Sequence, residues 1–183
     1  MVVDQPADVL AIIIKCINFA AVKHKYQRRK DPEKTPYVNH VIGVAEILTE
    51  EANVQDVEVI QAAILHDTVE DTDTSFDEIE AQFGVNVCQL VKEVTDDKSL
   101  PKAERKRLQV EHAAGSSPSA KLIKLADKLY NLRDLERVSP EGWAPERVQE
   151  YYEWAQKVVN ELRGTNKKLE DSLDEIFKRH CTS

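Results

Sequence analysis

The chain has 183 residues, with 33 acidic and 25 basic side chains and a formal net charge of −8. This length predicts one domain, residues 1–183, and the acidic balance excludes a general binder of nucleic acid, which neutralises phosphates with Lys and Arg. A hydrophobic content of 42% is enough for an ordinary core, and five glycines are too few for a loop-rich all-β fold.

Neither the cysteines nor the N-terminal segment indicates export. Cys16, Cys88 and Cys181 are far apart and form no Cys-x-x-Cys pair, so reduced thiols are expected. The longest apolar run near the N-terminus, residues 10–14, ends at Lys15 and is too short for a signal-peptide core or a membrane span. We expect a cytoplasmic protein that has no membrane partner.

Helical periodicity begins near the N-terminus. Residues 10–21 carry apolar side chains at three- and four-residue steps, as one buried face of a helix requires. The basic segment 23–34 follows, and two X-Pro pairs near its end favour an exposed loop. A second helix is predicted from about Asn39 and a third from about Asp56, since both residue types suit N-caps.

Helical spacing continues through the rest of the chain. The predicted ranges are 75–83, 85–94, 102–112, 119–137, 145–162 and 165–179. Gly84, Pro101 and Gly164 separate neighbouring ranges. No segment alternates as a strand does, and no repeat or low-complexity linker divides the chain. We therefore predict an all-α fold, a single bundle of about eight to ten helices.

The densest group of reactive side chains is a His-Asp-Thr-Val-Glu-Asp segment at the end of the third predicted helix. On a helix, Glu70 lies one turn from His66, and Asp71 one turn from Asp67. Seven acidic residues and no basic one lie between Asp67 and Glu80, so mutual repulsion would raise their pKa values. A divalent cation would relieve that repulsion; the alternative is a solvated acidic loop.

Two further candidates lie far from this segment in the sequence. His40 stands at the start of the second predicted helix, and Asp127 lies beside the apolar stripe of the range 119–137. A carboxylate there is costly to bury unless it is paired or binds a metal. The alternatives are a helix-start histidine bonded to backbone, and an aspartate paired with Lys124 or Lys128.

Together these residues resemble the HD-domain metal-dependent phosphohydrolases. Their pattern is a His, a His-Asp pair and a distant Asp, which here are His40, His66, Asp67 and Asp127. The segments Tyr-Val-Asn-His at 37–40 and Lys-Leu-Ala-Asp-Lys-Leu-Tyr-Asn-Leu-Arg at 124–133 look like those of the RelA/SpoT family of guanosine tetraphosphate (ppGpp) hydrolases. The resemblance is to the small hydrolase-only metazoan SpoT homologues in particular, and it covers nearly the whole chain.

Two positions depart from the family pattern. Val41 stands where many relatives have proline, and Tyr130 where the bacterial enzymes usually have histidine. Neither is a metal ligand in the family, so the implied mechanism is unaffected.

The resemblance implies one metal ion, held by His40, His66, Asp67 and Asp127. Two imidazoles and two carboxylates suit Mn²⁺, Fe²⁺ or Zn²⁺ better than Ca²⁺ or Mg²⁺, and the family favours Mn²⁺ over the other two. The ion would polarise a phosphoryl oxygen and activate a water molecule. The family assigns catalysis to Glu70 and Asp71, which would position or deprotonate that water; their division of labour stays open.

The resemblance also implies a set of nucleotide contacts. These are Arg29 and Lys30 on the nucleotide, Tyr37 for ring packing, Asn131 for ribose or base contact, and Lys102 and Arg147 for phosphate contact. The other basic residues of the 23–34 segment are interpreted as solvated. The three aromatic residues at 151, 152 and 154 are interpreted as core or surface side chains.

The function implied by the resemblance is a Mn²⁺-dependent ppGpp 3′-pyrophosphohydrolase that releases pyrophosphate and GDP. The length leaves no room for the synthetase and regulatory domains of long bacterial relatives, so the chain is expected to degrade the signal only. One alternative is removal of the 2′-phosphate of NADPH in the same site. Another is a non-enzymatic helical module that senses a nucleotide or docks a partner. Oligomeric state stays open.

Overall fold

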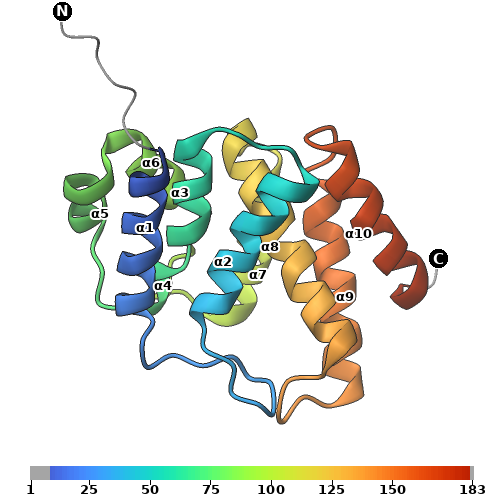
Figure 1. The fold of residues 1–183 in the computed structure, drawn as a ribbon. Coiled ribbons are helices and arrows are strands. Elements are labelled where there is room, and N and C mark those ends of the chain that lie inside the picture. The colour runs from blue at the N-terminus through green and yellow to red at the C-terminus, as the bar shows by residue number, and fades with distance from the viewer. Residues whose placement is uncertain (1–8, 182–183) are drawn as a thin grey trace, which may run out of the picture.

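The computed structural model describes residues 9–181, whose regular elements are helices (Figure 1). Their bounds are α1 Val9–Lys23, α2 Val38–Glu46, the π-helix η1 Ile47–Glu51, α3 Val57–Leu65, α4 Thr68–Asp71, α5 Phe76–Phe83, α6 Val85–Val94, α7 Lys102–Ala113, α8 Pro118–Arg137, α9 Pro145–Asn160 and α10 Lys167–His180. The predicted all-α bundle is confirmed. Within this part of the chain, no helix combines the length and apolar character needed to cross a bilayer. All three cysteines are free thiols.

The long helix α8 holds the bundle together. In Figure 1 it lies between α1, α3, α5 and α6 on one side and α9 and α10 on the other, and it packs against α2, α3, α6, α9 and α10. Its buried apolar side chains are Ala120, Ile123, Leu125, Ala126, Leu129, Leu132 and Leu135. A polar residue on this helix is therefore within reach of groups from several other elements.

The starts of α2 and α3 differ in how well they were predicted. Asp56 is the N-cap of α3, and its side chain accepts a hydrogen bond from the Glu58 amide at 2.9 Å. The predicted cap at Asn39 is wrong, because Tyr37 already has helical dihedral angles (φ −61°, ψ −30°) and α2 begins at Val38. Asn39 therefore lies inside the first turn.

The His-Asp-Thr-Val-Glu-Asp segment at the end of the third predicted helix lies across a break between two helices. α3 ends at Leu65, and the Thr68 hydroxyl donates to the Leu65 carbonyl at 2.6 Å. Asp67 has φ −99° and ψ −3°, and α4 begins at the next residue. A threonine hydroxyl that occupies a helix carbonyl competes with the helical backbone bond. His66 and Asp67 thus lie at a junction between two helices.

The basic segment between α1 and α2 is largely the exposed loop that was expected, but it contains two buried side chains. His24 and Asp31 are only 1% and 5% exposed. Asp31 accepts hydrogen bonds from the Thr35 amide at 3.0 Å and from its hydroxyl at 2.6 Å, which closes the loop. The Glu141 amide donates to the Lys30 carbonyl at 2.7 Å, so the loops after α1 and α8 meet at the lower edge of Figure 1.

Candidate active site

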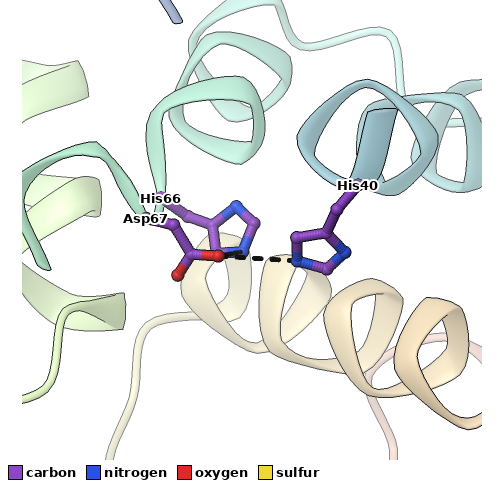
Figure 2. A group of neighbouring side chains, drawn as sticks. All are labelled: His40, His66 and Asp67. Carbon is purple, nitrogen blue, oxygen red and sulfur yellow. Dashed lines mark ion pairs between the residues drawn. The ribbon is translucent and has the colours of Figure 1, made fainter. Parts of the chain in front are cut away.

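Four candidate ligands from three parts of the fold converge. Figure 2 shows His40 of α2 pointing toward His66 and Asp67 of the α3–α4 junction. Asp67 Oδ2 lies 3.1 Å from His66 Nε2 and 3.5 Å from His40 Nε2. The ligand atoms of these three residues all lie within 4.8 Å of one another. Asp127 of α8 adds a second carboxylate, with Oδ1 3.2 Å from His40 Nε2 and 3.7 Å from His66 Nε2.

The hydrogen bonding of His66 fits a metal ligand. Its Nδ1 lies 2.7 Å from the Ala63 carbonyl, which can only accept, so Nδ1 carries the proton and Nε2 offers a lone pair. Nε2 is buried and has no hydrogen-bond partner. His66 Nε2 faces the carboxylates of Asp67 and Asp127. The nitrogen lone pair and the carboxylate oxygens repel one another unless a cation or a proton lies between them.

The charges of the cluster also call for a cation. Burial lowers the pKa of His66, but Asp67 and Asp127 outweigh burial and hold that pKa well above its ordinary value. Burial raises the pKa of the two carboxyl groups, yet the neighbouring positive groups keep both well below the usual range. A divalent ion with four N and O donors fits this arrangement.

A set of hydrogen bonds fixes the two carboxylates. The Tyr37 hydroxyl donates to Asp67 Oδ2 at 2.6 Å. Lys128 Nζ donates to Asp127 Oδ2 at 3.0 Å, and Asn131 Nδ2 donates to Asp127 Oδ1 at 2.7 Å. The ion pair with Lys128 was the structural alternative for Asp127, and it coexists with the approach of Oδ1 to the imidazoles. Such outer contacts orient ligands and tune their affinity for a metal.

Glu70 of α4 lines a cavity together with the four candidate ligands, and its pKa is raised. Its Oε2 accepts a hydrogen bond from the Asp96 amide at 3.2 Å, and its Oε1 lies 3.3 Å from Arg105 Nη1. Burial, followed by the charges of Asp67 and Asp96, raises the pKa of Glu70 to about 7. A carboxylate of that pKa can exchange a proton near neutral pH.

Asp71, the last residue of α4, is held from two sides. Gln27 Nε2 donates to Asp71 Oδ2 at 2.8 Å, and Lys98 forms an ion pair with Oδ1. Further along the acidic segment, Lys23 pairs with Glu78 at 2.9 Å. The expectation that Lys23 is solvated is therefore wrong, and bases from distant elements neutralise part of this segment.

Three adjoining cavities surround these residues. The metal cavity, about 430 Å³, contains the four candidate ligands, Glu70 and Arg105. The central cavity, about 400 Å³, is lined among others by Arg29, Lys30, Tyr37, Asp71, Asn131 and Trp143. The basic cavity, about 340 Å³, is lined by Lys102, Ala103, Lys106, Trp143, Arg147, Glu150 and Tyr151. Tyr151 borders all three.

The predicted nucleotide contacts divide between two of these cavities. In the central cavity, Arg29 donates to Asn131 Oδ1 at 2.8 Å and to Asp134 Oδ2 at 3.0 Å, and its guanidinium lies over the Tyr37 ring at 5.6 Å. In the basic cavity, burial lowers the pKa of Lys102, and the charges of Arg147 and Lys30 lower it further. Cations gathered in this way favour an anionic ligand.

Sequence reasoning missed several residues that line the cavities, among them Arg105, Lys106, Trp143 and Tyr151. Arg147 lies over the Trp143 ring at 4.3 Å. Tyr151, interpreted as a core or surface aromatic, is half-buried against the edge of the core and also lines the cavities, whereas its neighbour Tyr152 is 2% exposed. Consecutive helical residues point about 100° apart, so when one of the pair enters the core the other must face elsewhere. That signal was present in the sequence.

Comparison with known proteins agrees with this geometry. The family model for the HD domain matches residues 16–162. The chain belongs to the HD domain family. Its relatives include guanosine-3′,5′-bis(diphosphate) 3′-pyrophosphohydrolase MESH1 of Homo sapiens, which is 65% identical over 169 residues, covering 92% of this chain and 94% of the relative. The protein of the same name from Drosophila melanogaster is 62% identical, with the same coverage of both chains.

Solved structures with a similar fold also match this chain. The structure of a metazoan ortholog of SpoT that hydrolyzes ppGpp and plays a role in starvation responses superposes with a TM-score of 0.92 at 61% identity, covering 93% of this chain and 96% of that one. The crystal structure of lmo0812 from Listeria monocytogenes EGD-e gives 0.67 at 30% identity, covering 80% and 98%. The predicted relation to the metazoan SpoT homologues is confirmed, and the chain is an enzyme, a phosphohydrolase of the HD domain family.

Proposed function

We propose that the chain is a Mn²⁺-dependent ppGpp 3′-pyrophosphohydrolase that releases pyrophosphate and GDP and has no synthetase activity. The observation that carries the proposal is the convergence of two imidazoles and two carboxylates, with Glu70 and Asp71 beside them and a basic cavity nearby. The names of relatives that match nine tenths of the chain support the choice of substrate. We further propose a cytoplasmic location and a single domain.

In this proposal His40, His66, Asp67 and Asp127 hold the metal ion. When bound, the ion would polarise a phosphoryl oxygen and lower the pKa of a water molecule. Tyr37, Lys128 and Asn131 keep the two carboxylates in place through the hydrogen bonds described above. Because these hydrogen bonds already orient both aspartate carboxylates, the site needs little reorganisation when the substrate binds.

Glu70 and Asp71 take different tasks. Glu70, with a pKa of about 7, accepts a proton from the attacking water, since a base poised near the working pH is the most effective. Asp71 is tied to Gln27 and Lys98, which suits a group that orients the water by accepting a hydrogen bond. As the water oxygen bonds to phosphorus and the 3′ ester bond breaks, the proton passes to the ribose 3′ oxygen, so that GDP leaves with a 3′-hydroxyl group and the water oxygen stays on pyrophosphate.

The three cavities correspond to the three parts of ppGpp. The 3′-diphosphate lies in the metal cavity, beside Arg105. The nucleoside lies in the central cavity between Tyr37 and Tyr151, with Arg29, Lys30 and Asn131 at its edge. The 5′-diphosphate extends to Lys102 and Arg147 in the basic cavity, where Lys106 adds a third positive charge.

Two substitutions test the proposal together. Asp67→Ala should abolish both Mn²⁺ binding and pyrophosphate release, because it removes a ligand. Glu70→Ala should retain the metal and lose turnover, because Glu70 acts on the water. Metal content of the purified protein and the rate of pyrophosphate release from ppGpp are the measurements. Full activity in both variants would overturn the assignment.

Removal of the 2′-phosphate of NADPH is the second candidate. The observation in its favour is the breadth of the cleft, in which a central cavity with Trp143 and Tyr151 opens onto a basic one that could hold the single diphosphate bridge of NADPH. Steady-state rates with ppGpp and NADPH at equal Mn²⁺ concentration decide between the two. Release of pyrophosphate from ppGpp with a much higher kcat/KM supports the first proposal, and the reverse result supports the second.

A further inference from the structure

A buried histidine lies outside the group of metal ligands and catalytic residues. His24 follows the last residue of α1 and is 1% exposed. Its Nδ1 lies 2.6 Å from Gln27 Oε1, and its Nε2 is buried without a hydrogen-bond partner. Burial lowers the pKa of His24, which favours the neutral ring. Nothing in the proposed mechanism uses this side chain.

Gln27 connects His24 to the candidate active site. Its side-chain nitrogen donates to Asp71 Oδ2 at 2.8 Å, while its oxygen faces His24 Nδ1. An amide has one donating end and one accepting end, and a carboxylate can only accept. The nitrogen of Gln27 must therefore face Asp71, and the proton of the neutral His24 ring must sit on Nδ1.

The surrounding backbone holds this chain of hydrogen bonds in place. The Gln27 amide donates to the His24 carbonyl at 2.9 Å, and the Tyr37 amide donates to the Gln27 carbonyl at 3.1 Å. The His24 ring also packs against the Tyr37 ring, with centroids 5.1 Å apart. The hydrogen bonds that link His24, Gln27 and Asp71 therefore lie in a loop whose conformation is fixed by backbone hydrogen bonds and by ring packing.

We propose that His24 and Gln27 are positioning residues that hold the Asp71 carboxylate in its working orientation, with the Nδ1–H tautomer of His24 selecting the orientation of the Gln27 amide. If the tautomer changed, the lone pair of Nδ1 would face the amide oxygen and the amide would turn over. Its oxygen would then oppose Asp71 Oδ2, and the carboxylate would rotate away. The inference rests on the proposed role of Asp71.

The main test separates hydrogen bonding from simple space filling. His24→Leu should lower kcat by about 10- to 100-fold, the usual effect of losing an outer contact, with KM and Mn²⁺ content unchanged. His24→Asn should recover most of the rate, because its amide nitrogen can take the place of Nδ1–H. Gln27→Glu should lower kcat as much as His24→Leu, since it sets one carboxylate against another. His180→Asn, in α10 and paired with Glu136, is the matched control and should keep the wild-type rate.

A double substitution shows whether the effect passes through Asp71. Adding His24→Leu to Asp71→Asn should cause no further loss of kcat, because groups that act as one unit are not additive. An additive loss, or a wild-type kcat in His24→Leu and Gln27→Glu, would overturn the proposal. Should His24→Leu fold poorly, the ¹⁵N NMR shifts of the His24 ring in the wild-type protein test the proposal directly. The proposal requires the Nδ1–H tautomer, so an Nε2–H tautomer would overturn it. Each rate is measured on the nucleotide that the wild type hydrolyses. An inactive wild type would refute the proposed function. In that case the tautomer of His24 still tests the further inference, because it is measured without turnover.

Discussion

At Glu70, the burial that raises the pKa to about 7 also affects folding. The ordinary pKa of this group is 4.5, so the folded protein binds the Glu70 proton more tightly than the unfolded chain does. The contribution of Glu70 to the free energy of unfolding is therefore greatest below about pH 4.5. It falls as the pH rises and reaches its minimum above about pH 7. The side chain is 17% exposed, so solvent screens the effect only in part.

We predict that Glu70→Gln stabilises the metal-free protein at pH 8. The gain in unfolding free energy should be roughly 2 to 3 kcal/mol, because the amide carries no charge that burial would penalise. At pH 4.5 the two proteins should differ little. Urea unfolding at both pH values, with chelator present, is the measurement. An equal effect of the substitution at the two pH values would contradict the assigned pKa.

Tyr37 allows a test of the contacts behind the metal ligands. Its hydroxyl donates to Asp67 Oδ2, whereas its ring packs against His24 and lies under Arg29. Tyr37→Phe removes the first contact alone and should weaken Mn²⁺ binding by about 10-fold. Calorimetric titration measures the affinity. Tyr26→Phe is the control, because Tyr26 is 84% exposed, and it should leave the affinity unchanged; equal affinities in all three proteins would contradict the prediction.

Residue types and spacing were enough to single out His40, His66, Asp67 and Asp127 as candidates. Their interpretation as one ligand set came from the resemblance to the HD-domain family, since each residue alone also had a structural explanation. The groups that support them could not be found in this way. Gln27 and Lys98 contact Asp71 from 44 and 27 residues away in the sequence. Neither contact leaves a local pattern, since only the packing of the loop after α1, of α4 and of the loop before α7 brings these side chains together.

Among the helices, α2 and α8 approach unusually closely. A methyl group built on Gly43 would lie 2.1 Å from Tyr130 Cε2 and 2.7 Å from Cδ2. These are ring atoms of a side chain that also packs against His40, with centroids 4.9 Å apart. Glycine at this position lets α2 bring His40 to within 3.2 Å of Asp127 on α8.

Gly43→Ala should therefore destabilise the protein and weaken Mn²⁺ binding together. Alanine favours a helix by up to about 1 kcal/mol over glycine, but overpacking costs about 1 to 3 kcal/mol and separates the two ligands. Thermal unfolding and metal titration measure the two effects. Gly115→Ala is the matched control, because its methyl group would meet only the His112 carbonyl at 3.7 Å and should be tolerated. Stabilisation by Gly43→Ala with unchanged affinity would contradict the close approach.

The helices themselves were predictable, and their ends were less so. The apolar spacing of α6 and α8 fixes one buried face for each, and the observed bounds Val85–Val94 and Pro118–Arg137 lie at or within one residue of the predicted ones. The division between α3 and α4, where the Thr68 hydroxyl bonds the Leu65 carbonyl, was not predicted. The apolar periodicity of the sequence continues through this junction, so the break between the two helices cannot be predicted from the pattern.

For the molecule as a whole, the net charge of −8 conceals an uneven distribution. Acidic side chains gather around the candidate metal site, whereas Lys102, Lys106 and Arg147 line the basic cavity. The two regions meet at Tyr151. An anionic nucleotide can therefore bind an acidic protein, because field strength in a cleft depends on the nearest charges and not on the total.

The metal ion should also stabilise the entire fold, since its ligands join α2, the α3–α4 junction and α8. Binding only the folded state adds about 2.7 kcal/mol when Mn²⁺ is present at 100 times its dissociation constant. For a chain of this size we expect the melting temperature to rise by about 5 to 10 °C over that of chelator-treated protein. Scanning calorimetry with and without Mn²⁺ measures the shift.

Two variants show whether the shift arises at the proposed site. Asp127→Asn removes a ligand and should lose most of the shift, although its amide can still bond Lys128 through its oxygen. Glu70→Ala should keep the full shift, because Glu70 acts on water and not on the ion. If Mn²⁺ stabilised Asp127→Asn as much as the wild type, the ion would bind elsewhere, and the link between the three elements and the metal would be refuted.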